Sequence, residues 1–180
     1  RIAPGDDIPT LDGIACSWID WWVAYYAIYN RLITLGGMGE AYPDLAEDFP
    51  EVSEDGLTYV FHLKKGVKFH NGRQMTAHDV KYTIDRQFAL NQESCYNDFL
   101  AVIKGSEVPL AMAKENLPDF VELEGTQVVD DFTLRIELTK PMAVFPYILA
   151  TAAGNVVPKE EYLAAVRAGT VGTQVVIGTG

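Results

Sequence analysis

The stretch from Asp44 to Arg86 constrains the fold of this chain most, because almost all of it fits strands, tight turns or a helix. Within it, the segment Thr58 to Leu63 alternates between two faces, with Tyr59, Phe61 and Leu63 on the same side. A period of two residues is typical of a β-strand that is buried on one face. The stretch therefore predicts a half-buried strand with further short elements close by.

The turns and the helix of this stretch are marked by their own residue types. Asp55-Gly56 and Asn71-Gly72 are turn dipeptides, because these residues tolerate the positive φ that tight hairpins require. Thr76 and Asp79 fit a capping box, in which the hydroxyl and the carboxylate accept hydrogen bonds from backbone amides at a helix start. An apolar stripe at helical spacing follows this cap: Val80, Ile84 and Phe88.

The remaining elements are read from periodicity and from helix-breaking residues. A hairpin is expected at 127–129 and 133–138, around the turn residues Asp130 and Asp131. A helix over 21–35 would be apolar on most sides, would end at Gly36-Gly37 and would be buried on most sides. Further helices are predicted over 77–90, 96–104, 108–115, 143–150 and 158–169.

Length and charge narrow the classes of function. The 180 residues suffice for one hydrophobic core, or for a domain with a small appendage. A formal charge of -11 argues against binding to nucleic acid or to an anionic membrane, since both require a basic patch. The most apolar run, Trp21 to Ile33, is shorter than the roughly 20 residues of a membrane span. Cys16 and Cys95 are too few for a disulfide framework, so we expect two buried thiols, with a single bridge as the alternative.

Residues 45–80, LAEDFPEVSEDGLTYVFHLKKGVKFHNGRQMTAHDV, resemble the signature of the extracellular solute-binding proteins of family 5. These proteins are the peptide- and nickel-type receptors of ABC importers. Leu-Ala-Glu, Asp-Gly-Leu-Thr-Tyr, Phe-His-Leu, a basic pair, Phe-His and Thr-Ala-x-Asp-Val appear in the family's order and spacing. Residues 27–34, AIYNRLIT, also resemble the family helix that ends in aromatic-Glu-Gly-Leu, except that Asn30-Arg31 replaces Glu-Gly.

The resemblance implies an α/β fold with an α+β subdomain, in the type II periplasmic-binding-protein architecture. A mixed sheet, hairpins and flanking helices are expected. In that fold, residues 1–37 begin the ligand-binding lobe, residues 38–168 form the smaller subdomain that carries the signature, and residues 169–180 return to the lobe. Family members continue for a much longer distance, so we expect this chain to be an N-terminal fragment of a receptor.

Ligand contacts are expected mainly outside the signature. In the family, the irregular segment before the first helix lines the cleft, and the matching residues here are Cys16, Ser17, Trp18 and Ile19. A loop of this kind offers polar main chain, while an indole adds apolar area and one donor. The family also places the loop of Tyr96 and Asn97 near the mouth of the cleft. As an alternative, the tryptophans Trp18, Trp21 and Trp22 could be core residues, and we expect an apolar patch around Trp21, Trp22 and Tyr25 to be exposed.

Catalytic and metal sites are the alternatives to binding. His62, His70 and His78 recur every eight residues and could bind a metal, but they fall in a strand, before a turn and in a helix. The acidic pairs lie in or beside turns, where Asp and Glu are common for backbone reasons. We therefore expect no catalytic residue, no metal site and no cofactor.

The sequence thus predicts a substrate-binding component of an ABC importer without enzymatic activity. It would capture short peptides or a similar small solute, act as a monomer with the permease subunits, and bind no nucleic acid. It would be periplasmic or extracellular, either free or held by a lipid anchor. A metal-assisted hydrolase and a sensor- or permease-docking module without a transport role are the competing hypotheses. The isolated 180-residue chain is expected to bind ligand weakly or not at all.

Overall fold

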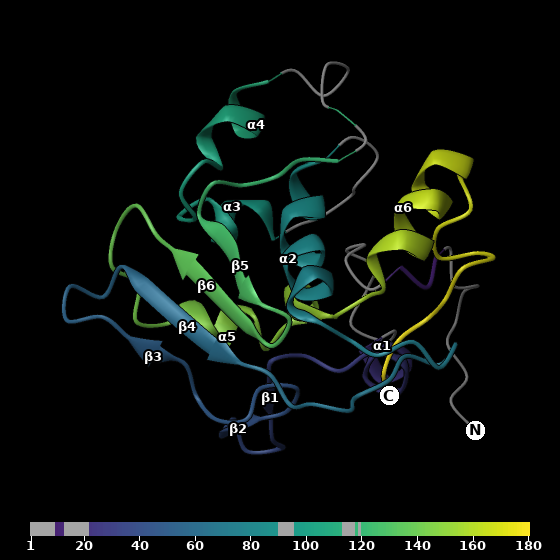
Figure 1. The fold of residues 1–180 in the computed structure, drawn as a ribbon, viewed down its shortest axis with the longest axis horizontal. Helices are drawn as coiled ribbons and strands as arrows, with labels where there is room; N and C mark the ends of the chain where they lie inside the picture. The colour runs from purple at the N-terminus through teal and green to yellow at the C-terminus, as the bar shows by residue number, and fades with distance from the viewer. Residues whose placement is uncertain (1–9, 13–21, 90–95, 113–117, 119) are drawn as a thin grey trace.

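A four-stranded antiparallel sheet occupies the left half of the computed structural model as drawn in Figure 1, with α2 (Ala77–Asp85) beside it and α1 (Trp22–Ile28) and α6 (Lys159–Ala168) on the right. The strands are β3 (Glu51–Val52), β4 (Thr58–His62), β5 (Thr126–Asp130) and β6 (Thr133–Glu137), in the spatial order β3-β4-β6-β5. The structure describes residues 10–12, 22–89, 96–112, 118 and 120–180. The strand predicted from 58–63 and the hairpin predicted around Asp130 and Asp131 are both confirmed.

One face of this sheet is buried and the other is open. Tyr59 lies opposite Ile136 and Phe61 lies opposite Leu134, and all four side chains are buried. The intervening residues of β4 and β6 are exposed or half-buried. Antiparallel sheets commonly cover one face only, which explains the alternation in the sequence.

Helix α2 (Ala77–Asp85) packs against β5 and β6 and continues into a 3-10 turn, η2 (Arg86–Phe88). The predicted cap is present, because the Asp79 carboxylate accepts a hydrogen bond of 2.9 Å from the Thr76 amide. The helix is shorter than the predicted range 77–90 because its last turn tightens into η2.

The first helix differs from its prediction. Helix α1 spans only Trp22–Ile28, and the segment predicted to continue it instead forms strand β1 (Ile33–Leu35), which pairs with β2 (Ala41–Pro43). The prediction of a helix over 21–35 is therefore wrong after residue 28. The reason is tertiary: the Asn30 carbonyl accepts from the Val156 amide, and the Asp44 carboxylate accepts from the Arg31 amide, so this backbone is paired outside any helix.

The other helices are present and mostly shorter than predicted. Helix α6 ends where expected, because Gly169 adopts a φ of 68°, a left-handed conformation that favours glycine. Their bounds are α3 (Asn97–Leu100), α4 (Glu107–Ala111), α5 (Phe145–Ile148), the 3-10 turn η4 (Ala152–Gly154) and α6 (Lys159–Ala168). On the buried side of the sheet, α5 places Phe145 against the Tyr59 ring, with ring centroids 5.3 Å apart. The α/β fold class is confirmed, and the named strands pair antiparallel throughout the described residues.

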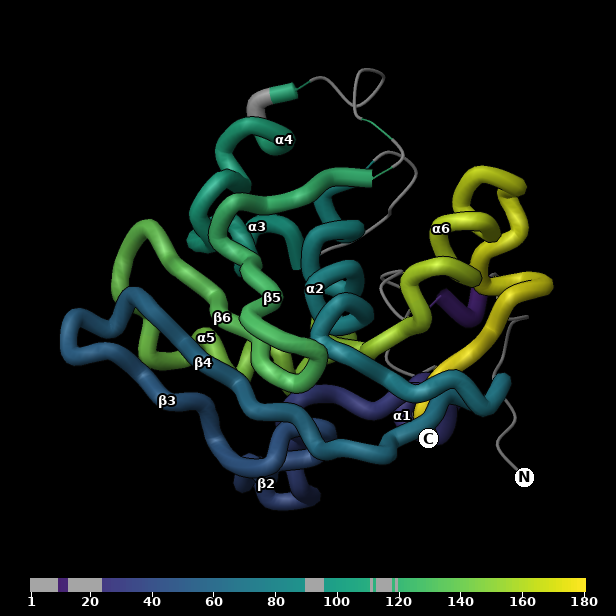
Figure 2. The backbone as a smooth tube through the Cα atoms, viewed as in Figure 1, coloured from purple at the N-terminus to yellow at the C-terminus, as the bar shows by residue number. Residues whose placement is uncertain are grey.

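A second hydrophobic cluster joins the two ends of the chain to α1 and α6. The Tyr29 and Tyr162 hydroxyls lie 2.6 Å apart, and the Tyr29 hydroxyl donates to the Leu11 carbonyl. The last residues run back to the end of α1, where the Gly180 amide donates to the Ile28 carbonyl (Figure 2). This part of the molecule is therefore held together by segments that are far apart in the sequence.

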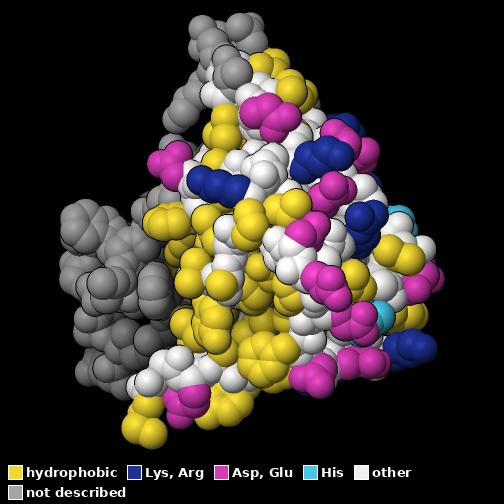
Figure 3. All heavy atoms as spheres, turned by 90° about the vertical axis from the view of Figure 1, so that its left-hand side faces the viewer, with side chains coloured by type: hydrophobic (Ala, Val, Ile, Leu, Met, Phe, Trp, Pro, Cys, Tyr) yellow, Lys and Arg dark blue, Asp and Glu magenta, His cyan; other side chains and the backbone are white. Residues whose placement is uncertain are grey.

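The surface is acidic with hydrophobic areas between the charges. Figure 3 shows hydrophobic side chains gathered over the middle of one face, with acidic side chains along its edge. Tyr25 does not belong to an exposed patch, because only 2% of it is exposed, so the expectation of exposure is wrong for this residue. Trp21 and the Trp22 side chain lie outside the described residues. None of the helices in the described ranges is long and apolar enough to cross a bilayer.

Candidate functional site

The ligand contacts predicted from the sequence fall in two places. Cys16, Ser17, Trp18 and Ile19 lie outside the described residues, as does Cys95, so the structure tests neither the predicted cleft segment nor the state of the cysteines. Tyr96 and Asn97, in contrast, are described, and both are half-buried at the start of α3.

Tyr96 reaches a cluster of side chains around the end of α1. Its hydroxyl lies beside the Thr151 side chain and the Ala152 backbone, and it is close enough to Tyr26 and Arg31 to interact electrostatically. Burial raises the pKa of the Tyr96 phenol, so this group stays neutral at physiological pH. The Asn97 side-chain oxygen is buried and accepts no hydrogen bond from the described residues.

A small cavity of about 50 Å³, the Arg31 cavity, lies beside this cluster. Its walls come from α1, from the segment leading into β1, and from the residues between α5 and η4. The lining residues are Tyr25, Tyr26, Arg31, Leu35, Ala150, Thr151 and Ala152. Three segments distant in the sequence therefore build one site.

Arg31 is the unusual member of this group. Only 2% of it is exposed, and its guanidinium carbon lies 3.7 Å above the centre of the Tyr26 ring. No hydrogen bond or ion pair joins its guanidinium to any of the described residues, and its Nε atom is completely buried. Burial lowers the pKa of Arg31, which is partly offset by the nearby Tyr26, Asp44 and Tyr96.

The sequence prediction did not include Tyr26 or Arg31 among the site residues. The available signal was the departure from the family pattern at Asn30-Arg31, where the resemblance leads one to expect Glu-Gly. A sequence pattern marks the substitution, but burial and the absence of a partner for the guanidinium are visible only in three dimensions.

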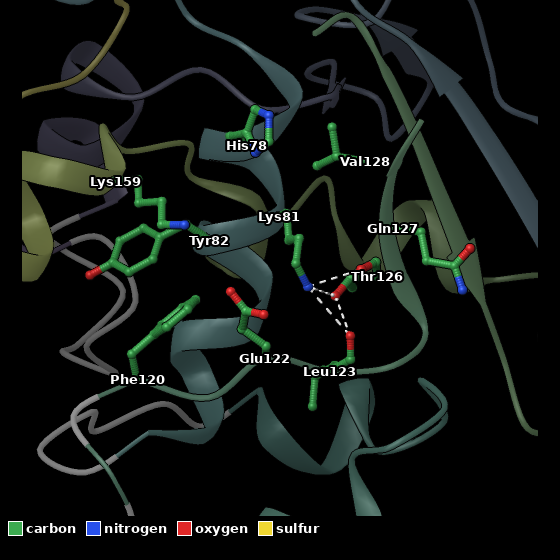
Figure 4. Close-up of a pocket in the computed structure, with 10 residues that line it drawn as sticks. All are labelled: His78, Lys81, Tyr82, Phe120, Glu122, Leu123, Thr126, Gln127, Val128 and Lys159. Atoms are coloured by element: carbon green, nitrogen blue, oxygen red, sulfur yellow. Dashed lines mark hydrogen bonds between the residues drawn. The ribbon is translucent and has the colours of Figure 1, made fainter. Parts of the chain in front are cut away.

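A larger groove of about 670 Å³ lies between α2, the start of α6 and the segment that leads into β5 (Figure 4). Lys81 points across it, and its ammonium group donates hydrogen bonds of 2.9 Å to the Thr126 carbonyl and hydroxyl oxygens. The Lys159 ammonium group lies 5.5 Å from the centre of the Phe120 ring. The cations that line the groove are thus engaged by neighbouring residues of the chain.

Beneath this groove, Lys81 and Asp85 form a buried polar network. The Lys81 ammonium group lies 2.6 Å from the Asp85 carboxylate, which also accepts a hydrogen bond from the Thr126 hydroxyl. Burial raises the pKa of Asp85 to about 6, and the Lys81 and Thr126 contacts only partly oppose this rise. The network ties α2 to β5, which gives it a structural role.

The three histidines have separate surroundings. His62 lies 3.4 Å from Glu51, His70 contacts the C-terminal residues, and His78 faces the groove of Figure 4. His70 uses both ring nitrogens: Nδ1 accepts from the Gly178 amide, and Nε2 lies 2.8 Å from the Gly180 carbonyl oxygen. Among the described residues, no group of three or more His, Cys, Asp or Glu side chains could hold a metal ion.

Comparison with known proteins gives consistent matches along the chain. The model of the family described as "Bacterial extracellular solute-binding proteins, family 5 Middle" matches residues 40–176. The dipeptide-binding protein of Escherichia coli is 38% identical over 151 residues, which cover 79% of this chain and 26% of that protein. Heme-binding protein A of Haemophilus influenzae is 38% identical over 125 residues, covering 66% of this chain and 21% of that protein.

Solved structures show the same fold. The complex of Haemophilus influenzae OppA with the peptide RPPGFSPFR aligns with a TM-score of 0.80 at 20% identity, over 98% of this chain and 33% of that one. At this identity the likeness concerns the fold alone, and it confirms the expected architecture. The chain spans about a quarter of the length of the curated relatives described above.

Proposed function

The chain belongs to family 5 of the bacterial extracellular solute-binding proteins, and on this premise we propose that it is part of the substrate-binding component of an ABC importer. The solute would be a short peptide or a similar small molecule, captured by closure of two lobes around it. The observation that carries this proposal is the 38% identity to a dipeptide-binding protein across 79% of the chain.

The same premise assigns parts of the chain to the ligand-binding lobe and to the subdomain. Residues 1–37 and 169–180 would belong to the ligand-binding lobe, and residues 38–168 would form the subdomain. The contacts of Leu11 and of residues 178–180 with α1 and its flanking residues support one common lobe for the two ends. Cys16, Ser17, Trp18, Ile19, Tyr96 and Asn97 stay the proposed ligand contacts.

The partners and the location are proposed at the level of the family. Family members are binding proteins of the extracytoplasmic space. This chain would act as a monomer that docks on permease subunits, either free in the periplasm or held at the cell surface by a lipid anchor. We also propose that it catalyses no reaction, since the binding role explains the family match without a catalytic centre.

Calorimetry tests the binding role. Protein purified as the cell produces it would be titrated with a dipeptide, a tripeptide, a longer peptide and haem. We expect at least one peptide to bind with one-to-one stoichiometry and a dissociation constant on the order of 1 μM or tighter. Haem is included because one relative carries that binding role in its name.

Mass spectrometry of the recovered ligand provides the control. An importer receptor returns the peptide intact, whereas a hydrolase returns fragments. Stoichiometric haem binding without peptide binding would change the substrate class, and cleavage of the peptide would overturn the proposed function.

A further inference from the structure

The Arg31 cavity contains a cation that forms no ion pair with the residues that the structure describes. The Arg31 guanidinium carries five N–H donors, and none of them is hydrogen-bonded by the residues that the structure describes. Asp44 is the acidic side chain that influences its pKa, but this carboxylate accepts hydrogen bonds from the Asn30 side chain and the Arg31 amide instead.

A buried charge of this kind is unfavourable by itself. Removing a guanidinium from water is compensated in proteins by ion pairs and hydrogen bonds, and an uncompensated buried charge is strongly destabilising. Arg86 is compensated by an ion pair: it is 1% exposed, pairs with Asp12 through Nη2, and its guanidinium carbon lies 5.0 Å from the centre of the Tyr162 ring, while its Nε and Nη1 atoms have no hydrogen-bond partner among the described residues. Arg31 has an aromatic neighbour of the same kind, but among the described residues the carboxylate that acts on it, Asp44, forms no ion pair with its guanidinium.

Stacking on Tyr26 does not occupy the hydrogen-bonding edge of Arg31. Tyr26 covers one face of the planar guanidinium at 3.7 Å. Because the N–H bonds lie in the plane of the group, stacking does not use them, and a planar fork of donors matches the two oxygens of a carboxylate. Tyr26 itself is 41% exposed, so the stacked pair lies close to the surface of the molecule.

The size of the cavity fits a small group. One water molecule requires about 10–15 Å³ of such a volume. The volume of about 50 Å³ therefore accommodates a few water molecules or one carboxylate group. The remaining lining, including Leu35 and Ala150, is mainly apolar, so it would strengthen an electrostatic contact by excluding water.

We propose that the Arg31 cavity is a subsite for a carboxylate group, which Arg31 binds through the edge of its stacked guanidinium. Two sources share this chemistry: the C-terminus of a captured peptide, and a small free carboxylate. The peptide source rests on the proposed function, whereas the anion site itself does not.

The first experiment uses acetate as the probe. The melting temperature of the protein, purified as the cell produces it, would be followed while acetate replaces chloride at constant ionic strength. Wild type is expected to gain about 2–4 °C once acetate exceeds its dissociation constant about fivefold. Arg31→Met removes the charge while keeping an apolar side chain, and it should abolish the gain. Arg135→Met, which removes a cation from the open face of the sheet, should leave the gain unchanged.

The second experiment separates the two sources of the carboxylate. The tightest-binding peptide would be compared with its C-terminal amide by calorimetry. If the cavity holds the peptide C-terminus, wild type should bind the free acid at least about 10-fold more tightly than the amide, and Arg31→Met should remove most of this difference. Arg135→Met again serves as the control.

Each outcome assigns the site. If acetate raises the melting temperature but the peptide acid and its amide bind equally, the cavity holds a free carboxylate. If acetate raises the melting temperature and no peptide binds, the proposed function is contradicted but the subsite is not. Peptide binding that is equal for acid and amide, together with no acetate effect in wild type, would overturn the subsite and leave the proposed function intact.

Discussion

At the scale of single residues, the tightest constraints come from glycines that lie against backbone atoms. A Cβ atom on Gly154 would lie 1.9 Å from the Leu149 carbonyl oxygen. Gly154 ends η4, beside the wall of the Arg31 cavity, and it is buried. Backbone atoms cannot move aside as a flexible side chain can, so this position requires glycine.

Gly154→Ala is therefore expected to destabilise the protein by more than about 2 kcal/mol, because the backbone between α5 and η4 must shift to admit a methyl group. Urea denaturation followed by tryptophan fluorescence measures the loss. Gly37→Ala is the matched control, since a Cβ there would meet nothing within 4 Å. Equal stability of the two variants would contradict the steric argument.

At the scale of elements, Asp79 joins the starts of two helices. It is 1% exposed and accepts hydrogen bonds from the Thr76 amide at the start of α2 and from the Lys159 amide at the start of α6. It also forms an ion pair with Arg73. The capping box that the sequence predicts thus has a second role, which the sequence pattern does not indicate.

Asp79→Ala should lower the free energy of unfolding by about 2–4 kcal/mol, because two helix amides lose their acceptor and Arg73 loses its buried partner, keeping only the more distant Glu160 and Glu161. The comparison is with Glu160→Ala, which removes a second carboxylate near Arg73 whose side chain is 71% exposed. Exposed ion pairs contribute about 0–1 kcal/mol, so that variant should resemble wild type. Similar losses in both variants, measured by urea denaturation, would refute the role of burial.

At the scale of the whole molecule, the buried network of Asp85 links stability to pH. The pKa of this carboxyl is raised from 3.8 to about 6 in the folded protein. The folded state therefore holds the proton more tightly than the unfolded chain does. This contribution to stability is fully present below about pH 4 and is lost as the pH rises through about 6.

The free energy of unfolding should consequently decrease by an amount on the order of 3 kcal/mol as the pH rises from 4 to 7. Urea denaturation across this range, compared between wild type and Asp85→Asn, isolates this decrease, because the variant has no proton to release. Glu54→Gln, at an exposed position, should keep the slope of wild type. An unchanged slope in Asp85→Asn would show that another group causes it.

Local patterns predicted the scaffold well where local geometry decides it. The alternation of 58–63, the capping box at Thr76 and the helix stop at Gly169 all depend on residues that are neighbours in the chain. The apolar run of residues 21–35 led to a wrong prediction of one long helix, because the same residues can be buried as a helix or as a strand. Pairing of β1 with β2, and of the Asn30 carbonyl with Val156, decided between them.

The sequence by itself determined the short elements of the scaffold, because turn residues, strand alternation and helix caps act over short distances. The family and the fold class came from the resemblance of residues 45–80 to the family signature. The tertiary structure alone decided where α1 ends and which residues surround Arg31. Whether a buried guanidinium has a partner depends on side chains brought together from α1, the residues before β1 and the segment around Thr151. No spacing along the chain records such a contact, since it arises only when distant segments pack.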